Sequence, residues 1–125
     1  MCLVITSKKL ITDKDIVCYK FLRSYREDRN HFYPPYFGFC YKRNKLYKTN
    51  IITEKERFSD YTFAYNGFHS LVCKLDRHLF DPYLPDYYKL YKCIIPKGSE
   101  YYLGRDKDIV SNQIIVKRRL FFNRF

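Results

Sequence analysis

Short apolar and aromatic runs, each bounded by polar or turn-forming residues, recur along this chain and predict β-strands. The clearest run covers residues 15–22, which are rich in β-branched and aromatic side chains between polar flanks. Further strands are expected over residues 37–42, 46–48, 61–65 and 88–95. The charged stretch 23–31 leads into Pro34 and Pro35, so it is expected to form a solvated loop.

One segment shows helical rather than alternating periodicity. Four apolar residues recur at i, i+1, i+4 and i+8, namely Leu71, Val72, Leu75 and Leu79. This spacing places them on one face of a helix. Ser70 is positioned to cap the first turn, and Pro82 to end the helix. The sequence therefore predicts one helix over about 70–80, preceded by a chain reversal at Asn66 and Gly67.

Turn-forming residues organise the C-terminal third. Pro96 and Gly98 follow the strand expected over 88–95 and favour a type I turn, from which residues 100–103 are expected to pair back as a hairpin. A last strand is expected over residues 109–116. The sum is a small α+β fold, with a mostly antiparallel sheet of about six or seven strands and one helix.

The chain has 125 residues, 46% of them hydrophobic and 20% aromatic, which is enough for a buried core. No repeat or Gly/Ser-rich linker divides it, so residues 1–125 are expected to form a single domain. No apolar stretch approaches about 18 residues, so no membrane span is predicted. The N-terminus lacks the basic and long apolar regions of a signal peptide.

Cysteine and carboxylate positions give no sign of a metal or catalytic centre. The five cysteines contain no C-x-x-C pair, which predicts no zinc site. Each lies in an apolar or aromatic neighbourhood, where a reduced thiol serves as a small core side chain, so a reducing, intracellular setting is expected. Paired carboxylates are absent from the apolar segments, so neither acid–base catalysis nor a bound metal or cofactor is predicted.

Charge changes this picture, because 24 Lys and Arg against 13 Asp and Glu give a net charge of +11. Such a field attracts phosphate-bearing partners, although a plainly solvated basic surface is the alternative. The densest basic cluster begins a C-terminal tail, residues 117–125, that is also aromatic. The side chains expected to contact a partner are Lys117, Arg118, Arg119, Phe121, Phe122 and Arg124.

A second basic and aromatic segment covers residues 31–45. Its rings can stack on bases while Lys42, Arg43 and Lys45 hold phosphates. The alternative is that the rings fill the core, which we favour for Phe37 and Phe39. The two interpretations stand nearly level for Tyr33 and Tyr36, and both also apply to the later residues Tyr83, Tyr87 and Tyr88.

Two further residues are candidates for contact with phosphate. His69 opens the expected helix, whose N-terminus favours anions, and its alternative role is a structural hydrogen bond. Lys97 lies in the turn before Ser99 but lacks the surroundings of a P-loop, so a plain turn is favoured there. The candidate ligand-binding residues are therefore Tyr33, Tyr36, Lys42, Arg43, Lys45, His69 and Lys97.

Several short motifs carry a resemblance. They are a Val-Cys-Tyr-Lys strand at 17–20, a Gly-Phe-His-Ser run at 67–70, and a Cys-Ile-Ile-Pro-Lys-Gly-Ser run at 93–99 followed by Tyr101, Tyr102 and Gly104. In this pattern the chain resembles small proteins of tailed phages and their Bacteroidetes-type hosts. The resemblance covers most of the chain in order, is most specific in the last stretch, and implies a phage-type origin without implying an activity.

The Ile-Pro-Lys-Gly turn at 95–98 also resembles one in the ADP-ribosyltransferase fold, where a strand with the catalytic glutamate follows. Here that strand offers Ser111, Asn112 and Gln113, without a carboxylate. Lys20 stands where the family uses Arg or His, and the middle motif is His-Ser rather than Ser-Thr-Ser. The resemblance therefore implies a nucleotide-binding relative without the group that activates the ribose hydroxyl.

Together these features favour a non-enzymatic, phage-type accessory protein that binds an anionic ligand, either a nucleotide signal or nucleic acid, through the 31–45 region. Counter-defence by sequestration of that ligand fits this chemistry. One alternative is a virion structural or packaged protein that docks through the tail on another subunit or on DNA, and another is an ADP-ribosyltransferase-like enzyme. The expected location is the host cytoplasm or the virion, without a membrane partner, and an oligomer is compatible with the sequence.

Overall fold

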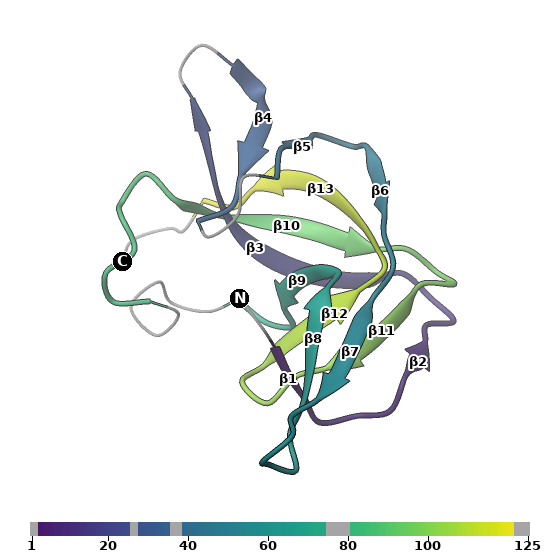
Figure 1. Cartoon of the computed structure of the whole chain (residues 1–125). Helices are drawn as coiled ribbons and strands as arrows, with labels where there is room; N and C mark the ends of the chain where they lie inside the picture. The colour runs from purple at the N-terminus through teal and green to yellow at the C-terminus, as the bar shows by residue number, and fades with distance from the viewer. Residues whose placement is uncertain (1–2, 26–27, 36–38, 75–80, 122–125) are drawn as a thin grey trace.

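Antiparallel β-structure dominates the chain in the computed structural model, which describes residues 3–25, 28–35, 39–74 and 81–121 (Figure 1). Within these ranges there are thirteen strands, arranged in a ten-stranded and a three-stranded sheet, and no helix. The expected α+β class, with about six or seven strands and one helix, is therefore wrong. No described helix is long and apolar enough to cross a membrane.

The ten-stranded sheet has a continuous path of eight strands. In spatial order they are β2 (Leu10–Ile11), β11 (Glu100–Leu103), β12 (Asp108–Ser111), β9 (Phe68–Leu71), β3 (Ile16–Tyr25), β10 (Lys89–Ile95), β13 (Gln113–Arg119) and β6 (Leu46–Lys48). Off this path, β4 (Asp28–Tyr33) pairs with β3 and with β5 (Tyr41–Lys42). The smaller sheet has the order β1 (Leu3–Ile5), β8 (Thr62–Asn66) and β7 (Ile52–Lys55).

The start of the expected helix is strand β9. Its residues pair with four residues of β12, and Leu71 also pairs with Tyr19 of β3. This pairing buries Phe68, Ser70 and Leu71. Non-local pairing thus overrides the local helical periodicity, as it commonly does where sheet contacts decide burial. The rest of the expected helix, residues 75–80, lies outside the described residues.

Strands β3 and β10 form the centre of the large sheet through seven consecutive antiparallel pairs, from Lys89 opposite Leu22 to Ile95 opposite Ile16. Side chains alternate between faces, so Cys18 and Leu22 enter one core cluster while Phe21 enters another. The strands expected over 15–22 and 88–95 are confirmed. Because β3 is covered on both faces, its sequence is nearly continuous in apolar residues.

The expected loop 23–31 is wrong, because β3 continues to Tyr25 and returns as β4. This hairpin projects beyond the rest of the sheet (Figure 1). Strand pairing joins backbone groups, so a charged sequence can form it without the apolar pattern that would have indicated a strand. The strand expected over 46–48 is confirmed as β6, and the one over 61–65 as β8 shifted by one residue. Only Tyr41 and Lys42 of the expected strand 37–42 are paired, and residues 37–38 lie outside the described ranges.

The large sheet curls around its main core. The ring centroid of Tyr41 lies 6.2 Å from that of Phe68 on β9 and 5.5 Å from that of Tyr47 on β6, although β3, β10 and β13 separate β9 from β6 in the sheet. The side chains buried inside this curl come from seven strands: Cys18, Leu22, Phe32, Tyr41, Phe68, Tyr91, Cys93, Ile95, Ile109, Ile114 and Val116. With Tyr47 packed against it, the core therefore connects β9 with β6 across the curl.

The small sheet packs on the outer face of β12 through fully buried Ala64 and Val110. The chain passes between the two sheets at Gly67, whose φ is +126°. Strands β8 and β9, on either side of this glycine, belong to different sheets and do not pair. The reversal expected at Asn66 and Gly67 is thus a crossing between layers rather than a hairpin turn.

The C-terminal third has a turn at the expected place, but the expected type I geometry and the expected pairing are both wrong. Ser99 N donates to Pro96 O at 3.1 Å, and the φ of +87° at Gly98 makes the turn type II. Strand β11 then pairs with β2 and β12 instead of β10. The strand expected over 109–116 is divided at Asn112, whose side-chain oxygen accepts a hydrogen bond from Glu100 N at 2.9 Å.

We expect Gly67→Ala to destabilise the fold strongly, by about 3 kcal/mol or more, because its Cβ adds a collision to an unfavourable positive φ. That Cβ would lie 2.6 Å from Val110 Cγ2. Gly98→Ala is the matched control, since its φ is also positive but nothing lies within 4 Å of the new Cβ. Urea unfolding should show a loss of only about 1–2 kcal/mol for the control. Equal losses in the two variants would contradict the close packing of the layers at Gly67.

Candidate functional site

An open groove lies where the end of β13 meets the β3–β4 hairpin. Its volume is about 630 Å³, and it is lined by Ser24, Tyr25, Phe32, Arg43, Tyr91, Arg118, Arg119 and Phe121. Three of these residues carry guanidinium groups and four carry aromatic rings. The described lining contains no carboxylate, so this is a positively charged, aromatic groove.

The floor of the groove belongs to the main core. Phe32 and Tyr91 are only 1% and 3% exposed, and their ring centroids lie 4.7 Å apart. The outer rings differ, because Tyr25 is 49% exposed and Phe121 is 78% exposed. A rigid apolar floor therefore lies beneath rings whose surfaces are available to a ligand.

A β-bulge sets the positions of the arginines on β13. Cys93 pairs with Val116 but Lys92 pairs with Arg118, so Lys117 is the extra residue on β13. The bulge consequently places Arg119 opposite Tyr91, at the floor of the groove. A regular strand would have placed Arg118 in that position.

The third arginine, Arg43, is fixed by the same bulge. Its backbone bridges to Val116, and its Nη1 donates to the carbonyl oxygen of Lys117 at 3.4 Å. Its Cζ lies 5.3 Å from the ring centroid of Phe32. Backbone pairing and ring stacking thus hold a guanidinium over the floor without neutralising its charge.

The remaining two arginines have no carboxylate partner among the described residues. Arg119 Cζ lies 4.7 Å from the ring centroid of Phe121, and Arg118 is exposed. Among the residues that the structure describes, the recorded ion pairs are Lys9 with Glu100 and Arg105 with Asp106, both outside the groove. Converging guanidinium groups without carboxylate partners are suited to phosphate or another anion.

The groove unites residues from both candidate sets. Arg43 comes from the 31–45 region, whereas Arg118, Arg119 and Phe121 come from the expected tail. The first part of the expected tail is a strand, because β13 extends to Arg119. The next residue is also held by the sheet, since Leu120 N donates to Leu90 O at 2.8 Å. Lys117 contributes its carbonyl oxygen rather than its ammonium group. Three of the candidates, Tyr36, Phe122 and Arg124, lie outside the described residues.

Other candidates do not line the groove. Tyr33 is not among the lining residues, but its ring centroid lies 5.3 Å from that of Tyr25, which is. Lys42 and Lys45 are exposed beside Tyr47, which accepts the Lys42 N–H at 2.7 Å and has Lys45 Nζ 5.2 Å from its ring centroid. Lys97 lies in the turn after β10, where its N–H donates to Asp15 Oδ1 at 2.8 Å. That interaction supports the plain-turn interpretation.

His69 is part of a half-buried polar group on β9, so its expected place at a helix N-terminus is wrong. Its carbonyl oxygen accepts a hydrogen bond from Lys20 Nζ, and its Nε2 has no hydrogen-bond partner among the described atoms. Burial, reinforced by the charge of Lys20, lowers the pKa of His69 to about 4. This environment disfavours the cationic form that would bind phosphate.

Lys20 is a buried cation that the sequence interpretation missed. It is 8% exposed, its Nζ lies 5.5 Å from the Tyr41 ring centroid, and burial lowers its pKa while Cys93 and Cys18 oppose that shift. The sequence signal for its burial is its spacing. Lys20 lies two residues from both Cys18 and Leu22, so in a strand all three side chains face the core. Cys18 and Cys93, paired across β3 and β10, are fully buried free thiols.

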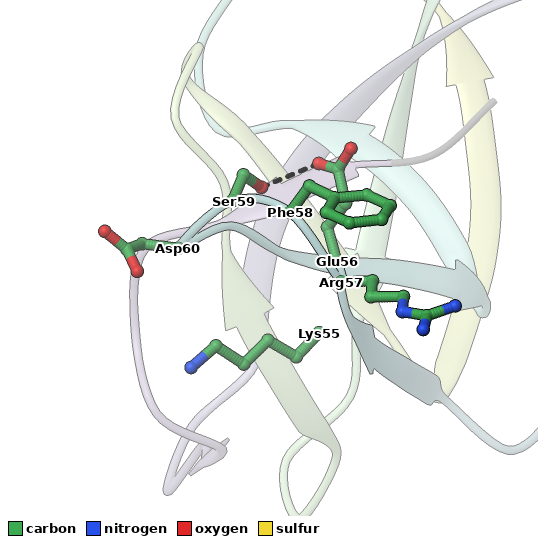
Figure 2. A pocket seen from close by; sticks show the side chains of 6 residues that line it. All are labelled: Lys55, Glu56, Arg57, Phe58, Ser59 and Asp60. Atoms are coloured by element: carbon green, nitrogen blue, oxygen red, sulfur yellow. Dashed lines mark hydrogen bonds between the residues drawn. The ribbon is translucent and has the colours of Figure 1, made fainter.

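A second hollow of about 600 Å³ is formed by consecutive residues 55–60 between β7 and β8. Figure 2 shows that the Arg57 side chain extends to the opposite side from those of Lys55 and Asp60. Ser59 Oγ donates to Glu56 Oε2 at 2.7 Å, which stabilises the turn itself. With no convergence of polar groups, this hollow is a feature of the loop rather than a binding site.

The residues that carry the likeness to ADP-ribosyltransferases have structural roles here. Ser111 is fully buried and its Oγ donates to Gln113 O at 2.9 Å, while Asn112 accepts from Glu100 N. In the described part of the chain, no three His, Cys, Asp or Glu side chains gather in a way that could hold a metal ion.

The lowered pKa of His69 predicts a pH-dependent stability. Between pH 4 and about 6.5 the unfolded state binds the proton more strongly than the folded state, so the free energy of unfolding should rise with pH. The full contribution is about 3 kcal/mol. Chemical unfolding at several pH values should show a smaller rise for His69→Gln than for the unsubstituted protein. The same rise in both proteins would show that His69 is not its source.

Comparison with protein-family models, with curated proteins and with solved structures finds no match for this chain. The groove and the chemistry of the residues that line it are therefore the basis for a functional proposal.

Proposed function

We propose that this protein is a non-enzymatic binding protein for single-stranded nucleic acid, and that the groove is its binding site. The observation that carries this proposal is the convergence of Arg43, Arg118 and Arg119 around aromatic rings in a lining without a described carboxylate. Single-strand binding sites combine these two elements, cations for the backbone and rings for the bases.

The arginines and the rings have separate roles in this proposal. Guanidinium groups bind phosphate oxygens through two parallel hydrogen bonds and keep their charge at any physiological pH. The exposed rings of Tyr25 and Phe121 offer faces on which bases stack without reading their sequence. The site therefore favours unpaired nucleotides over a duplex, in which the base faces are already covered by their neighbours.

Size and overall charge support the same ligand. A volume of about 630 Å³ lies within the roughly 300–1,000 Å³ of small-molecule sites, so a nucleotide fits. The net charge of +11 attracts a polyanion from a distance and predicts salt-dependent binding. The groove is open, which suits a strand that passes through it.

The biological setting that we propose is the one that the sequence resemblance implies, a phage-type accessory protein in the host cell. Binding without catalysis is sufficient for such a role if the protein sequesters a nucleic acid or a nucleotide signal. A free nucleotide and a single strand both offer a phosphate and a base. Comparison of the affinities for a mononucleotide and an oligonucleotide therefore shows which of them is the ligand.

Replacement of Arg118 and Arg119 by alanine should weaken binding of a fluorescent oligo(dT) strand at least tenfold. Each hydrogen bond to a charged group contributes about 1.5–3 kcal/mol, and two phosphate contacts are lost. The slope of log K against log salt should fall in magnitude by about 1.4, or about 0.7 for each contact. Fluorescence anisotropy at several salt concentrations measures both quantities.

The matched control is Lys8→Ala with Lys14→Ala, which removes two exposed positive charges outside the groove lining. It should change the affinity much less than the arginine substitutions. An equal loss in the two variants would mean that binding depends on net charge rather than on the groove. Tight binding of AMP or another mononucleotide with no gain for oligo(dT) would identify a free nucleotide as the ligand instead.

A further inference from the structure

The groove continues into a neighbouring group of tyrosines around Arg23. Arg23 Cζ lies 4.3 Å from the ring centroid of Tyr25, which itself lines the groove, and 4.0 Å from that of Tyr87. Tyr88 completes the group, with its ring centroid 5.0 Å from that of Tyr87. The residues Tyr25, Arg23 and Tyr87 form what we call the Tyr–Arg–Tyr column.

The column is partly exposed in the way that a stacking surface requires. Tyr25 and Tyr87 are 49% and 52% exposed, so each ring has surface available beyond its contact with Arg23. Tyr33 supports Tyr25 from the side, in an edge-to-face contact with an interplanar angle of 70°. The rings are therefore held in place while part of their surface faces solvent.

Arg23 has features that a purely structural contact does not explain. Its Nε is buried without a hydrogen-bond partner among the described atoms, although buried donors are nearly always paired. Its guanidinium lies over two rings, an arrangement that holds a planar cation in place and leaves its charge available. The column thus repeats the combination of a cation and aromatic rings that characterises the groove.

We infer that a single strand bound in the groove continues over Tyr25 onto the Tyr–Arg–Tyr column, where Tyr87 stacks on a second group of bases and Arg23 attracts the backbone. This inference rests on the proposed function, because it extends the same site. Arg23 and Tyr87 are not among the residues that line the groove, and Arg23 contacts Tyr25, which is. A ligand that occupies the groove and also reaches Tyr87 is therefore an oligonucleotide rather than a mononucleotide or dinucleotide. The contacts are with bases and backbone in general, so the strand is bound without sequence preference.

The test compares binding of oligo(dT) strands of two and eight nucleotides by isothermal titration calorimetry. The unsubstituted protein should bind the longer strand at least tenfold more tightly. Tyr87→Ala should remove most of this gain, about five- to 100-fold for the loss of one stacked base, and leave the affinity for the dinucleotide unchanged. Tyr83→Ala is the matched control, because Tyr83 belongs to the same loop and is 90% exposed.

The outcomes separate the two proposals. If the unsubstituted protein binds neither strand, the proposed function fails and this inference fails with it. If the protein binds both strands but Tyr87→Ala and Tyr83→Ala retain the full gain with length, only the column is refuted. A photocrosslink from a bromouracil-containing octamer to Tyr87, located by mass spectrometry, supports the column, whereas crosslinks confined to the groove residues Tyr25 and Phe121 overturn it.

Discussion

Seven consecutive pairs between β3 and β10 determine which side chains enter each core and which reach the groove. Their strict alternation sends Cys18 and Cys93 into the curl of the large sheet, while Phe21 and Leu90 pack on its outer face. A shift of one residue would exchange these faces and expose both cores at once. The register of these pairs therefore fixes the face of the sheet on which each side chain of β3 lies, including that of Tyr25 at its end.

The groove depends on this ladder through Tyr91. This residue pairs with Lys20 on one side and with Arg119 on the other, so it connects the buried centre of the sheet to the arginines of the groove. Its ring, together with Phe32, supplies a floor that cannot move without disturbing the main core. A site built on core residues is held more firmly than one built on loops, and its charged groups can then project from a fixed base.

Much of the strand pattern could be predicted from sequence, because residues 15–22 and 88–95 carry their strand signal locally. The helix expected over 70–80 is wrong at Leu71, because pairing with β12 and β3 decides the conformation there. No local sequence pattern indicates this pairing. For the site, the residue types were predictable but their assembly was not. Arg43 and Arg118 are far apart in sequence, and they are brought together by the bridge between Arg43 and Val116 and by the hydrogen bond from Arg43 to the Lys117 carbonyl, which no local pattern indicates. The burial of Lys20 was not predicted, because a lysine within an apolar run is usually taken as a solvent-facing position of the strand.

The bulge at Lys117 separates the part of β13 that belongs to the core from the part that belongs to the groove. The groove arginines can therefore be repositioned there while the core stays unchanged. Residues before the bulge, such as Val116, are fully buried and fix the strand, whereas the two arginines after it belong to the groove. Loss of the extra residue would leave the first half of β13 in register and interchange the orientations of the side chains that follow. A single-codon deletion or insertion here would change the directions of Arg118 and Arg119 in one step, so the chemistry of the groove can change while the core that supports it stays the same.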